Sequence, residues 1–293
     1  MFWGVIYKIY NICSRKNKTN TIIKPDVINL NNKQSVKIVS YNINGLFAHY
    51  NHTNYLHISK YIRNLFLNED VDIICLQELW EKNIYNLIIN NLQDLNLFIS
   101  QPPTNLKYCI GEHSGLLTIS KYPIILSDFE KYEKLNFTCA MTNKGFQYIV
   151  IKINNEYIPI INTHLQSSSN KWNLQYQNVV VNQINLIKDY LIKFNIKNSI
   201  ILGDLNLKEN FMNTFLNNNS EFDTPYDYKN LITFPSDNEV LDYFLFYNDI
   251  FNDKICDFKI HNNIFYSDHF PISLEISNKK YNLRKKIKVE HID

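Results

Sequence analysis

The stretch SIILGDLNL (residues 199–207) places two polar side chains at the end of a predicted buried strand. Residues 200–202 form the short apolar run that is typical of a strand buried on both faces. Gly203 interrupts the run, and Asp204 and Asn206 follow with one residue between them. If the extended backbone continues, both side chains point to the same side, because residues two apart share a face of a strand. The alternative is a turn, since Gly, Asp and Asn are common turn formers.

A carboxylate and an amide that emerge together suit phosphate chemistry. The carboxylate can hold a metal ion or orient a water molecule, and the amide can donate to a phosphoryl oxygen. Taken alone, the stretch favours the turn, but several other predicted strands also end in polar residues. These strand ends carry Asn42, Glu78, His164, Asp204, Asn206, Asp242, Asp268 and His269. A buried strand has no structural need for so many polar endings, so we expect them to gather in one cleft.

The composition limits the class of protein. With 45% hydrophobic residues, the chain of 293 residues can bury a large core, and its net charge of +2 is too small to indicate nucleic acid or an anionic surface as a partner. The five cysteines are odd in number and widely spaced, and no CxxC pair occurs. This pattern argues against a disulfide framework or a zinc site and favours a reducing compartment. We therefore expect an intracellular, cytoplasmic and monomeric globular protein.

The two ends of the chain differ from the middle. Residues 1–13 are apolar and aromatic, too short to span a bilayer, and without the pattern of a signal peptide. They either pack on the protein or lie at a membrane interface. Residues 279–288 carry six basic side chains, which are either solvated, the interpretation we favour, or attracted to anionic lipid or nucleic acid. The two segments together predict at most a weak, peripheral membrane contact.

The middle of the chain alternates strand and helix patterns. Helical spacing of apolar residues occurs near residues 56–66 and 87–92, and a long amphipathic helix is expected at about 173–194. The expected strands are residues 36–41, 71–76, 114–119, 124–126, 146–153, 157–161, 200–202 and 240–246. This mixture predicts an α+β or α/β sandwich with both sheet faces covered. No internal repeat or long linker divides it, so we expect one domain.

Six short motifs lie at the ends of the predicted strands. They are Tyr41-Asn42-Ile43-Asn44-Gly45, Leu76-Gln77-Glu78, Thr163-His164-Leu165, Gly203-Asp204-Leu205-Asn206, Leu241-Asp242-Tyr243 and Ser267-Asp268-His269. In this order they resemble the motifs of the endonuclease/exonuclease/phosphatase superfamily. The resemblance implies a four-layer αββα sandwich, in which two packed, mainly antiparallel β-sheets are flanked by helices. It also implies a catalytic domain at residues 35–278, between an N-terminal extension (1–34) and the basic tail (279–293).

The resemblance further implies metal-dependent hydrolysis of phosphoester bonds, usually with Mg²⁺, and with Mn²⁺ as an alternative. It makes Glu78 the main metal carboxylate, with Asn42 beside it and Asp268 near the metal. Magnesium prefers oxygen ligands and keeps several waters, so one or two carboxylates suffice. For Glu78 alone, the alternative is an acidic residue that stabilises the start of a helix.

The other motif residues have catalytic roles by the same resemblance. His269 would be the general base that takes a proton from the attacking water, held by Asp242. A buried His paired with a carboxylate can also be structural, and for a lone His this is the more frequent case. Asp204 would orient the water or assist the leaving group, Asn206 would donate to a phosphoryl oxygen, and His164 would stabilise the developing charge. The substrate-binding residues implied are Asn206, His164 and Asn42.

The motifs are most similar to those of neutral sphingomyelinases. The similar segments are residues 76–80, 115–117 with 120–124, 163–166 and 241–243. The run Asn44-Gly45-Leu46, in contrast, is closer to the nuclease and tyrosyl-DNA phosphodiesterase branches. The prediction is a magnesium-dependent phosphodiesterase that acts on a sphingomyelin-like phospholipid. The alternatives are hydrolysis of nucleic acid and, in a different class, a non-catalytic binding module of the same fold.

Overall fold

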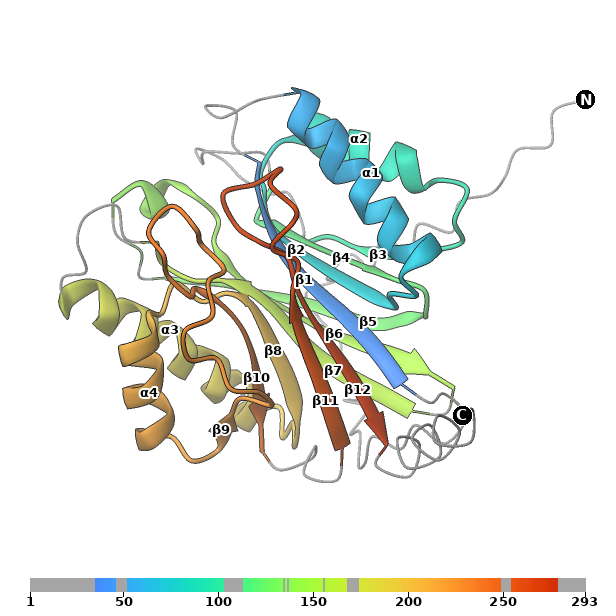
Figure 1. The fold of residues 1–293 in the computed structure, drawn as a ribbon. Helices are drawn as coiled ribbons and strands as arrows, with labels where there is room; N and C mark the ends of the chain where they lie inside the picture. The colour runs from blue at the N-terminus through green and yellow to red at the C-terminus, as the bar shows by residue number, and fades with distance from the viewer. Residues whose placement is uncertain are drawn as a thin grey trace, which may run out of the picture.

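The computed structural model describes residues 35–45, 52–102, 113–133, 135, 137–154, 156–167, 174–248 and 254–278. Within these residues, the chain forms two six-stranded β-sheets with helices on both outer sides (Figure 1). The predicted N-terminal extension and basic tail lie outside the described residues. No helix in the described part is long and apolar enough to cross a membrane.

The first sheet, sheet A, has the strand order β11-β12-β1-β2-β4-β3. Its strands are β1 (Ser35–Gly45), β2 (Ile73–Leu79), β3 (Phe98–Ser100), β4 (Gly115–Ser120), β11 (Lys254–Ile260) and β12 (Ile272–Asn278). The central strands β1 and β2 are parallel, and both are flanked by antiparallel neighbours. Their carboxyl ends therefore lie side by side at one edge of the sheet.

The second sheet, sheet B, repeats this arrangement with the order β5-β6-β7-β8-β10-β9. Its strands are β5 (Ile124–Lys131), β6 (Gly145–Ile153), β7 (Glu156–His164), β8 (Ser199–Asp204), β9 (Phe222–Asp223) and β10 (Asp242–Tyr247). Here β7 and β8 form the central parallel pair, and β6 and β10 flank them antiparallel. Each sheet thus brings two adjacent strand ends to one edge.

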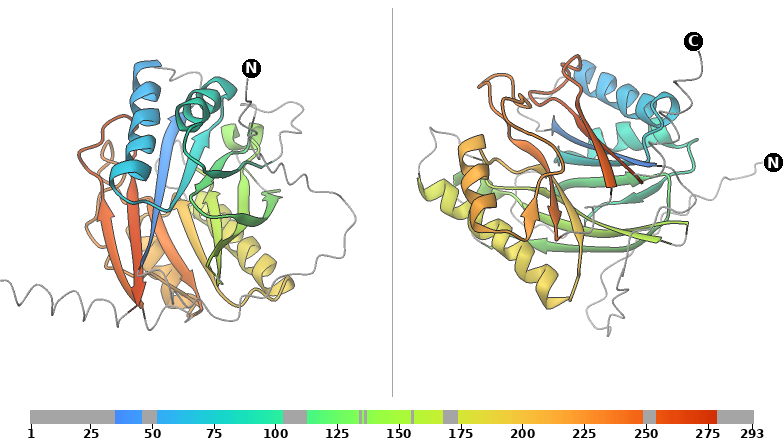
Figure 2. Two further views of the ribbon diagram at one scale, coloured as in Figure 1. Left: turned by 90° about the vertical axis from the view of Figure 1, so that its right-hand side faces the viewer. Right: turned by 60° about the horizontal axis from the view of Figure 1, so that its bottom comes forward.

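The helices cover the outer faces of the two sheets (Figure 2). Helices α1 (His52–Asn68) and α2 (Lys82–Leu92) pack on sheet A, and α3 (Leu174–Lys193) and α4 (Glu209–Asn218) pack on sheet B. A short 3₁₀ helix, η2 (Phe137–Met141), precedes β6. In α1, Ile58, Ile62 and Leu65 are fully buried, and their spacing puts them on one face of the helix.

Three apolar cores separate the four layers. One lies between α1, α2 and sheet A, one between the two sheets, and one between sheet B and α3, α4. The core between the sheets is rich in β-branched side chains, such as Ile38, Ile73, Ile151 and Ile200. Such residues pack well on the face of a sheet. The predicted αββα sandwich with mainly antiparallel sheets is confirmed.

Candidate active site

The ends of the central strands of both sheets converge on one cluster of polar side chains. Asn42 lies on β1, Glu78 on β2, His164 at the end of β7 and Asp204 at the end of β8. The strands β7 and β8 approach closely at Gly203, where a Cβ atom would lie 1.9 Å from the carbonyl oxygen of Thr163. Only glycine fits this position, because its φ of 135° is also unfavourable for other residues.

Asn42 links the carboxylates of the two sheets. Its Nδ2 donates to Oε1 of Glu78 at 3.1 Å and to Oδ2 of Asp204 at 3.0 Å. Its Oδ1 accepts the backbone N–H of Asn44 at 3.0 Å, which fixes the orientation of the amide. The predicted neighbourhood of Asn42 and Glu78 is therefore present, and Asn42 also contacts Asp204.

His269 and Asp242 form a hydrogen-bonded pair. His269 Nδ1 and Asp242 Oδ2 are 2.8 Å apart, and both side chains are buried, so the predicted contact is confirmed. His269 Nε2 faces Asp204 Oδ2 at 3.7 Å. Burial alone would lower the pKa of His269, but the charges of Asp242 and Asp204 outweigh it and raise the pKa to about 10. In the absence of a compensating cation, this histidine therefore carries its proton at neutral pH.

A threonine that was not anticipated from the sequence supports this pair. The Oγ1 of Thr233 accepts the backbone N–H groups of Leu241 and Asp242, at 3.0 and 3.1 Å. Its carbonyl oxygen accepts the N–H of Phe270 at 2.8 Å. Thr233 is fully buried, and it joins the start of β10 to the segment that carries His269.

Lys144 is a second residue that the sequence did not single out. Its buried Nζ lies 2.8 Å from His164 Nε2 and donates to the carbonyl oxygen of Leu165 at 2.8 Å. The other ring nitrogen of His164, Nδ1, is buried and has no hydrogen-bond partner among the described residues. Burial and the charges of Lys144 and His269 hold the pKa of His164 well below its usual value. Lys144 directly precedes Gly145, the first residue of the apolar strand β6.

Glu78 is turned into the cluster by an unusual backbone conformation. Its φ of 57° lies in the left-handed region, where a residue other than glycine is strained. The indole N–H of Trp80 donates to Oε2 of Glu78 at 3.4 Å. Glu78 is 18% exposed, and Asp204 is 3% exposed. Helix α2 begins only at Lys82, so Glu78 is a residue of β2 and does not cap that helix.

Asn206 departs from the expected extended backbone. Strand β8 ends at Asp204, and Asn206 has a φ of 50°. Its backbone N–H donates to Oδ1 of Asp204 at 3.0 Å, as in an Asx turn, and its Nδ2 donates to the carbonyl oxygen of Leu165 at 3.3 Å. The turn is therefore the correct alternative, yet it still keeps Asn206 beside Asp204.

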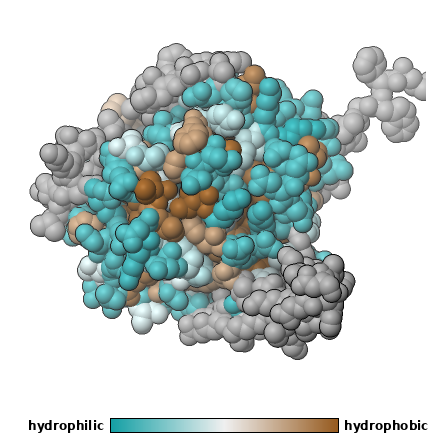
Figure 3. Space-filling model, in the orientation of Figure 1, coloured by the Kyte–Doolittle hydropathy of each residue, from teal (hydrophilic) through white to brown (hydrophobic). Residues whose placement is uncertain are grey.

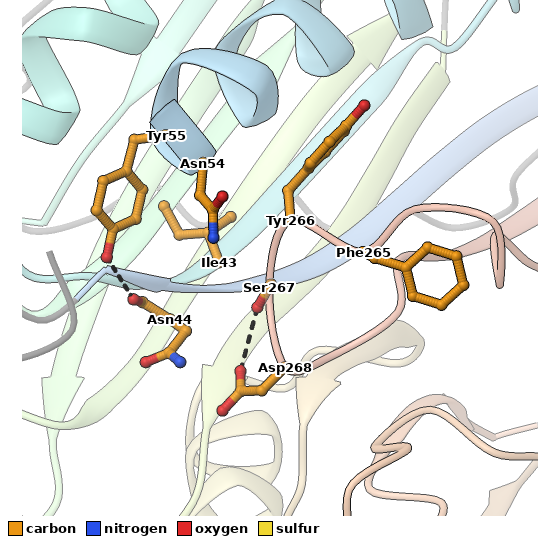
Figure 4. Close-up of a pocket in the computed structure, with 8 residues that line it drawn as sticks. All are labelled: Ile43, Asn44, Asn54, Tyr55, Phe265, Tyr266, Ser267 and Asp268. Carbon is orange, nitrogen blue, oxygen red and sulfur yellow. Dashed lines mark hydrogen bonds between the residues drawn. The ribbon is translucent and has the colours of Figure 1, made fainter. Parts of the chain in front are cut away.

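Asp268 lies outside the central cluster. Its exposed carboxylate accepts the hydroxyl of Ser267 at 3.2 Å and lines a cavity of about 120 Å³ with Asn44 and Tyr55 (Figure 4). Ser267 also donates to the carbonyl oxygen of Asn42 at 2.8 Å, which ties this loop to β1. Of the sequence-predicted residues, Asp268 is therefore at the rim, and the other seven lie in or directly against the cluster.

The oxygen atoms of the cluster fit a divalent cation. Glu78, His164 and Asp204 each offer a ligand atom within 4.8 Å of the others, and so do Asp204, Asp242 and His269. Burial raises the pKa of Asp204, and the nearby charges of Asp242 and Glu78 raise it further. Oδ1 of Asp242 is buried and has no hydrogen-bond partner among the described residues. Carboxylate oxygens are ligands that Mg²⁺ prefers, and Glu78 is the most accessible of these carboxylates. The amide oxygen of Asn42, the other ligand expected beside Glu78, instead accepts the N–H of Asn44.

Comparison with known families assigns the chain. The family model described as "Endonuclease/Exonuclease/phosphatase family" matches residues 39–269, which include every residue of the cluster. The chain therefore belongs to the endonuclease/exonuclease/phosphatase family, and the sequence-based resemblance is confirmed.

Within this family, the chain is similar to two sphingomyelinases and to a bacterial toxin. A sphingomyelinase of Dictyostelium discoideum is 29% identical over 169 residues, which is 46% of this chain and 37% of the relative. Sphingomyelinase C of Bacillus cereus is 26% identical over 222 residues, 66% of this chain and 62% of the relative. The chain thus spans less than two thirds of the length of either. The β toxin of Staphylococcus aureus, in a mutant with bound magnesium ions, superposes with a TM-score of 0.67 at 20% identity, over 84% of this chain and all of the toxin.

Proposed function

We propose that this protein is a Mg²⁺-dependent phosphodiesterase that hydrolyses a sphingomyelin-like phospholipid. The observation that carries the proposal is that one cluster contains two different groups of functional side chains. One is the carboxylate Glu78, linked to Asp204 by Asn42, and the other is the His269–Asp242 pair. The first suits an oxygen-ligated cation and the second suits proton transfer. A binding module of the same fold would not need both.

The proton-transfer roles follow from the hydrogen bonds. Asp242 holds Nδ1 of His269, so Nε2 is the atom that accepts a proton from the attacking water. A bound Mg²⁺ would supply positive charge near Glu78 and Asp204, which polarises the phosphate and offsets the carboxylates that raise the pKa of His269. The raised pKa of Asp204 suits a group that orients water or protonates the leaving oxygen. Lys144 and Asn206 would stabilise the charge that develops on the phosphate.

Apolar side chains near the cluster support a lipid substrate over nucleic acid. Five large apolar side chains are exposed among the described residues, and three of them are Met141, Ile232 and Phe265, at 54%, 36% and 70%. Each of these three lies only a few residues from Lys144, Thr233 or His269 in the chain. On the face shown in Figure 3, hydrophobic residues gather near the centre, close to the loops that lead into β10 and β12. Exposed apolar side chains beside a site favour an interface with lipid, whereas a nucleic-acid site would need a basic surface.

The experiment measures release of phosphocholine from sphingomyelin vesicles beside nicking of plasmid and abasic DNA. Each reaction is run with Mg²⁺, with Mn²⁺ and with EDTA. We expect Mg²⁺-dependent hydrolysis of the lipid that EDTA abolishes. Hydrolysis of DNA without release of phosphocholine would replace the lipid substrate by nucleic acid. Absence of both activities would contradict a phosphodiesterase.

The membrane contact has its own test. We propose that Phe265 and the two chain ends (1–13 and 279–293) hold the protein weakly at the surface of an intracellular membrane. Phe265→Ser and removal of the ends should each lower hydrolysis of vesicle-borne lipid and leave hydrolysis of a soluble phosphodiester unchanged. The matched control is Ile192→Ser, which removes a 57% exposed apolar side chain from α3. Equal losses on both substrates would mean that these groups support the fold instead.

A further inference from the structure

The space between the two sheets contains a polar contact directly below the cluster. Gln77 on β2 and Asn162 on β7 are both fully buried. Nε2 of Gln77 donates to Oδ1 of Asn162 at 2.8 Å, so the bond runs from sheet A to sheet B. Gln77 also exchanges hydrogen bonds with Ser40 on β1. These amides replace apolar packing at one end of an interface that is otherwise an apolar core.

Asn162 also holds an irregular part of the neighbouring sheet. Pairing between β2 and β4 is regular up to Leu76 and Leu117, and it shifts before the next pair, Leu79 and Gly115. Nδ2 of Asn162 donates to the carbonyl oxygens of Leu76 and Leu117, both at 3.2 Å. An amide of sheet B therefore holds the last regular pair of sheet A, at the point where the strand begins to deviate.

Glu78 lies inside this irregular segment. It follows Gln77 directly, and its left-handed backbone turns the carboxylate toward the cleft. On the other sheet, His164 follows Asn162 by two residues, and its Nε2 is 3.7 Å from Oε1 of Glu78. The amide pair thus connects the two strands just before each delivers its functional side chain. A change in the distance between the amides would move the two functional groups relative to one another.

We propose that Gln77 and Asn162 are positioning residues, which hold Glu78 in register with the groups of sheet B. This inference rests on the proposed function, in which Glu78 is the metal carboxylate. Two leucines of similar volume would fill the same space, but the hydroxyl of Ser40 and the carbonyl oxygens of Leu76 and Leu117 would lose their bonds to the two amides. The amide pair therefore contributes to stability as well, and its positioning role is tested by metal affinity, because residues that orient a metal ligand typically change that affinity about tenfold to a hundredfold when they are lost.

The test uses Gln77→Leu, Asn162→Leu and the double variant in the full-length protein. Each single variant leaves one buried amide without its partner and should lower the melting temperature. The double variant removes both amides, so its loss should be smaller than the sum of the two single losses. We expect the dissociation constant for Mg²⁺, measured by isothermal titration calorimetry, to rise about tenfold to a hundredfold in all three. We expect kcat on a soluble phosphodiester to fall while KM changes little, because the phosphate-binding groups of sheet B remain.

Gln147→Leu is the matched control. Gln147 is equally buried between the sheets, accepts the hydroxyl of Thr118 at 2.9 Å and donates to Ser100 at 2.9 Å. It lies opposite Asn162 in the register of β6 and β7, but these bonds run to neither amide of the pair. It should lower the melting temperature and leave Mg²⁺ affinity unchanged. Recovery of Mg²⁺ affinity and kcat together with stability in the double variant would overturn the proposal, as would an equal loss of affinity in Gln147→Leu. A wild type that binds Mg²⁺ but hydrolyses no phosphodiester would contradict the proposed function only, because the metal titration would still test the positioning role.

Discussion

The space between the two sheets is apolar at one end and polar at the other, although the same strands line both ends. Along β2, Ile73 and Cys75 belong to the apolar core, whereas Gln77 and Glu78 are polar. Along β8, Ile200 and Leu202 are followed by Asp204. Each of these strands thus contributes to the apolar core and, within a few residues, to the polar cluster.

The difference shows how the chain tolerates buried charge. Asp204, Asp242 and Lys144 are all buried, and burial of charge is unfavourable unless the charges are paired. At the apolar end, removal of hydrocarbon side chains from water stabilises the sandwich and holds the strands in place. Stability should therefore depend mainly on the apolar end, and activity mainly on the polar end. Four measurements can confirm or contradict that separation.

The largest effect is expected for Glu78→Gln. Loss of the accessible metal carboxylate should remove several kcal/mol of transition-state stabilisation, which corresponds to a rate decrease of about a thousandfold or more. The melting temperature without metal should not fall, because the substitution relieves repulsion between Glu78 and Asp204. Initial rates and thermal unfolding in EDTA measure the two quantities. Full turnover by the variant, or by the wild type in EDTA, would contradict the assignment.

The next effect is expected for His269→Asn. A positioned general base contributes about a hundredfold to ten-thousandfold, so kcat should fall within that range. Asp242→Asn should lower kcat as well, because the imidazole loses the partner that holds its Nδ1 proton. The control is Mg²⁺ binding, which should persist in both variants if Glu78 is the main ligand. Near-normal kcat in His269→Asn would mean that this pair is structural.

A substitution at the apolar end should lower stability and leave kcat unchanged. Ile151→Ala removes a fully buried side chain from β6 and should cost about 2–5 kcal/mol of unfolding free energy. Urea unfolding measures this loss, and kcat measured on the folded variant should stay close to that of the wild type. A fall in kcat as large as that of His269→Asn would contradict the separation between the two ends.

The smallest effect is a pH dependence outside the site. His261 is buried like His269, but among the described residues no carboxylate is hydrogen-bonded to it; its Nε2 lies 3.0 Å from the hydroxyl of Ser273. Burial lowers its pKa to about 4, and the charges of Lys259 and Lys37 act in the same direction. In the unfolded chain this histidine has a pKa of about 6.5, so as the pH falls it binds a proton in the unfolded state before it does so in the folded state. The contribution of His261 to stability is therefore complete above about pH 6.5 and is lost as the pH falls toward 4.

His261→Gln should remove that part of the pH dependence. The difference in unfolding free energy between wild type and variant should change by about 2 kcal/mol between pH 7 and pH 4. Urea unfolding at several pH values measures it, and a constant difference across this range would show that His261 does not titrate as a buried neutral group. His261 and His269 thus have pKa shifts of opposite sign, because the carboxylates of Asp242 and Asp204 raise the pKa of His269.

Much of the fold could be predicted because apolar runs define the central strands. The strands at residues 71–76 and 157–161 were visible as such runs, the strand at 36–41 was visible as an alternating pattern, and the polar residues at their ends were visible as well. The strands β3, β9, β11 and β12 and the helix α4 were not predicted. β11 lies at the edge of sheet A, where Lys254, Asp257 and Lys259 interrupt the apolar pattern.

The candidate site could be predicted only where a motif names its residues. Lys144 and Thr233 act through contacts with residues 8 to 37 positions away, and no local pattern marks them. The backbone conformation of Asn206 depends on a hydrogen bond to Asp204, which the sequence allowed equally in a strand or a turn. Spacing therefore identified which residues matter, but the hydrogen bonds that define their roles required the structure.

The position of β12 has a consequence for how the protein matures. Sheet B is made from one continuous part of the chain, residues 124–247, whereas β1 of sheet A pairs with β12, more than 230 residues later. Such distant pairing raises the contact order and delays completion of sheet A during synthesis. The bond from Ser267 to Asn42 and the pair of His269 with Asp242 form only when this last part has joined. We expect a nascent chain that ends before β11 to fold around sheet B and to remain inactive, so catalytic competence would be acquired only after β12 has been synthesised.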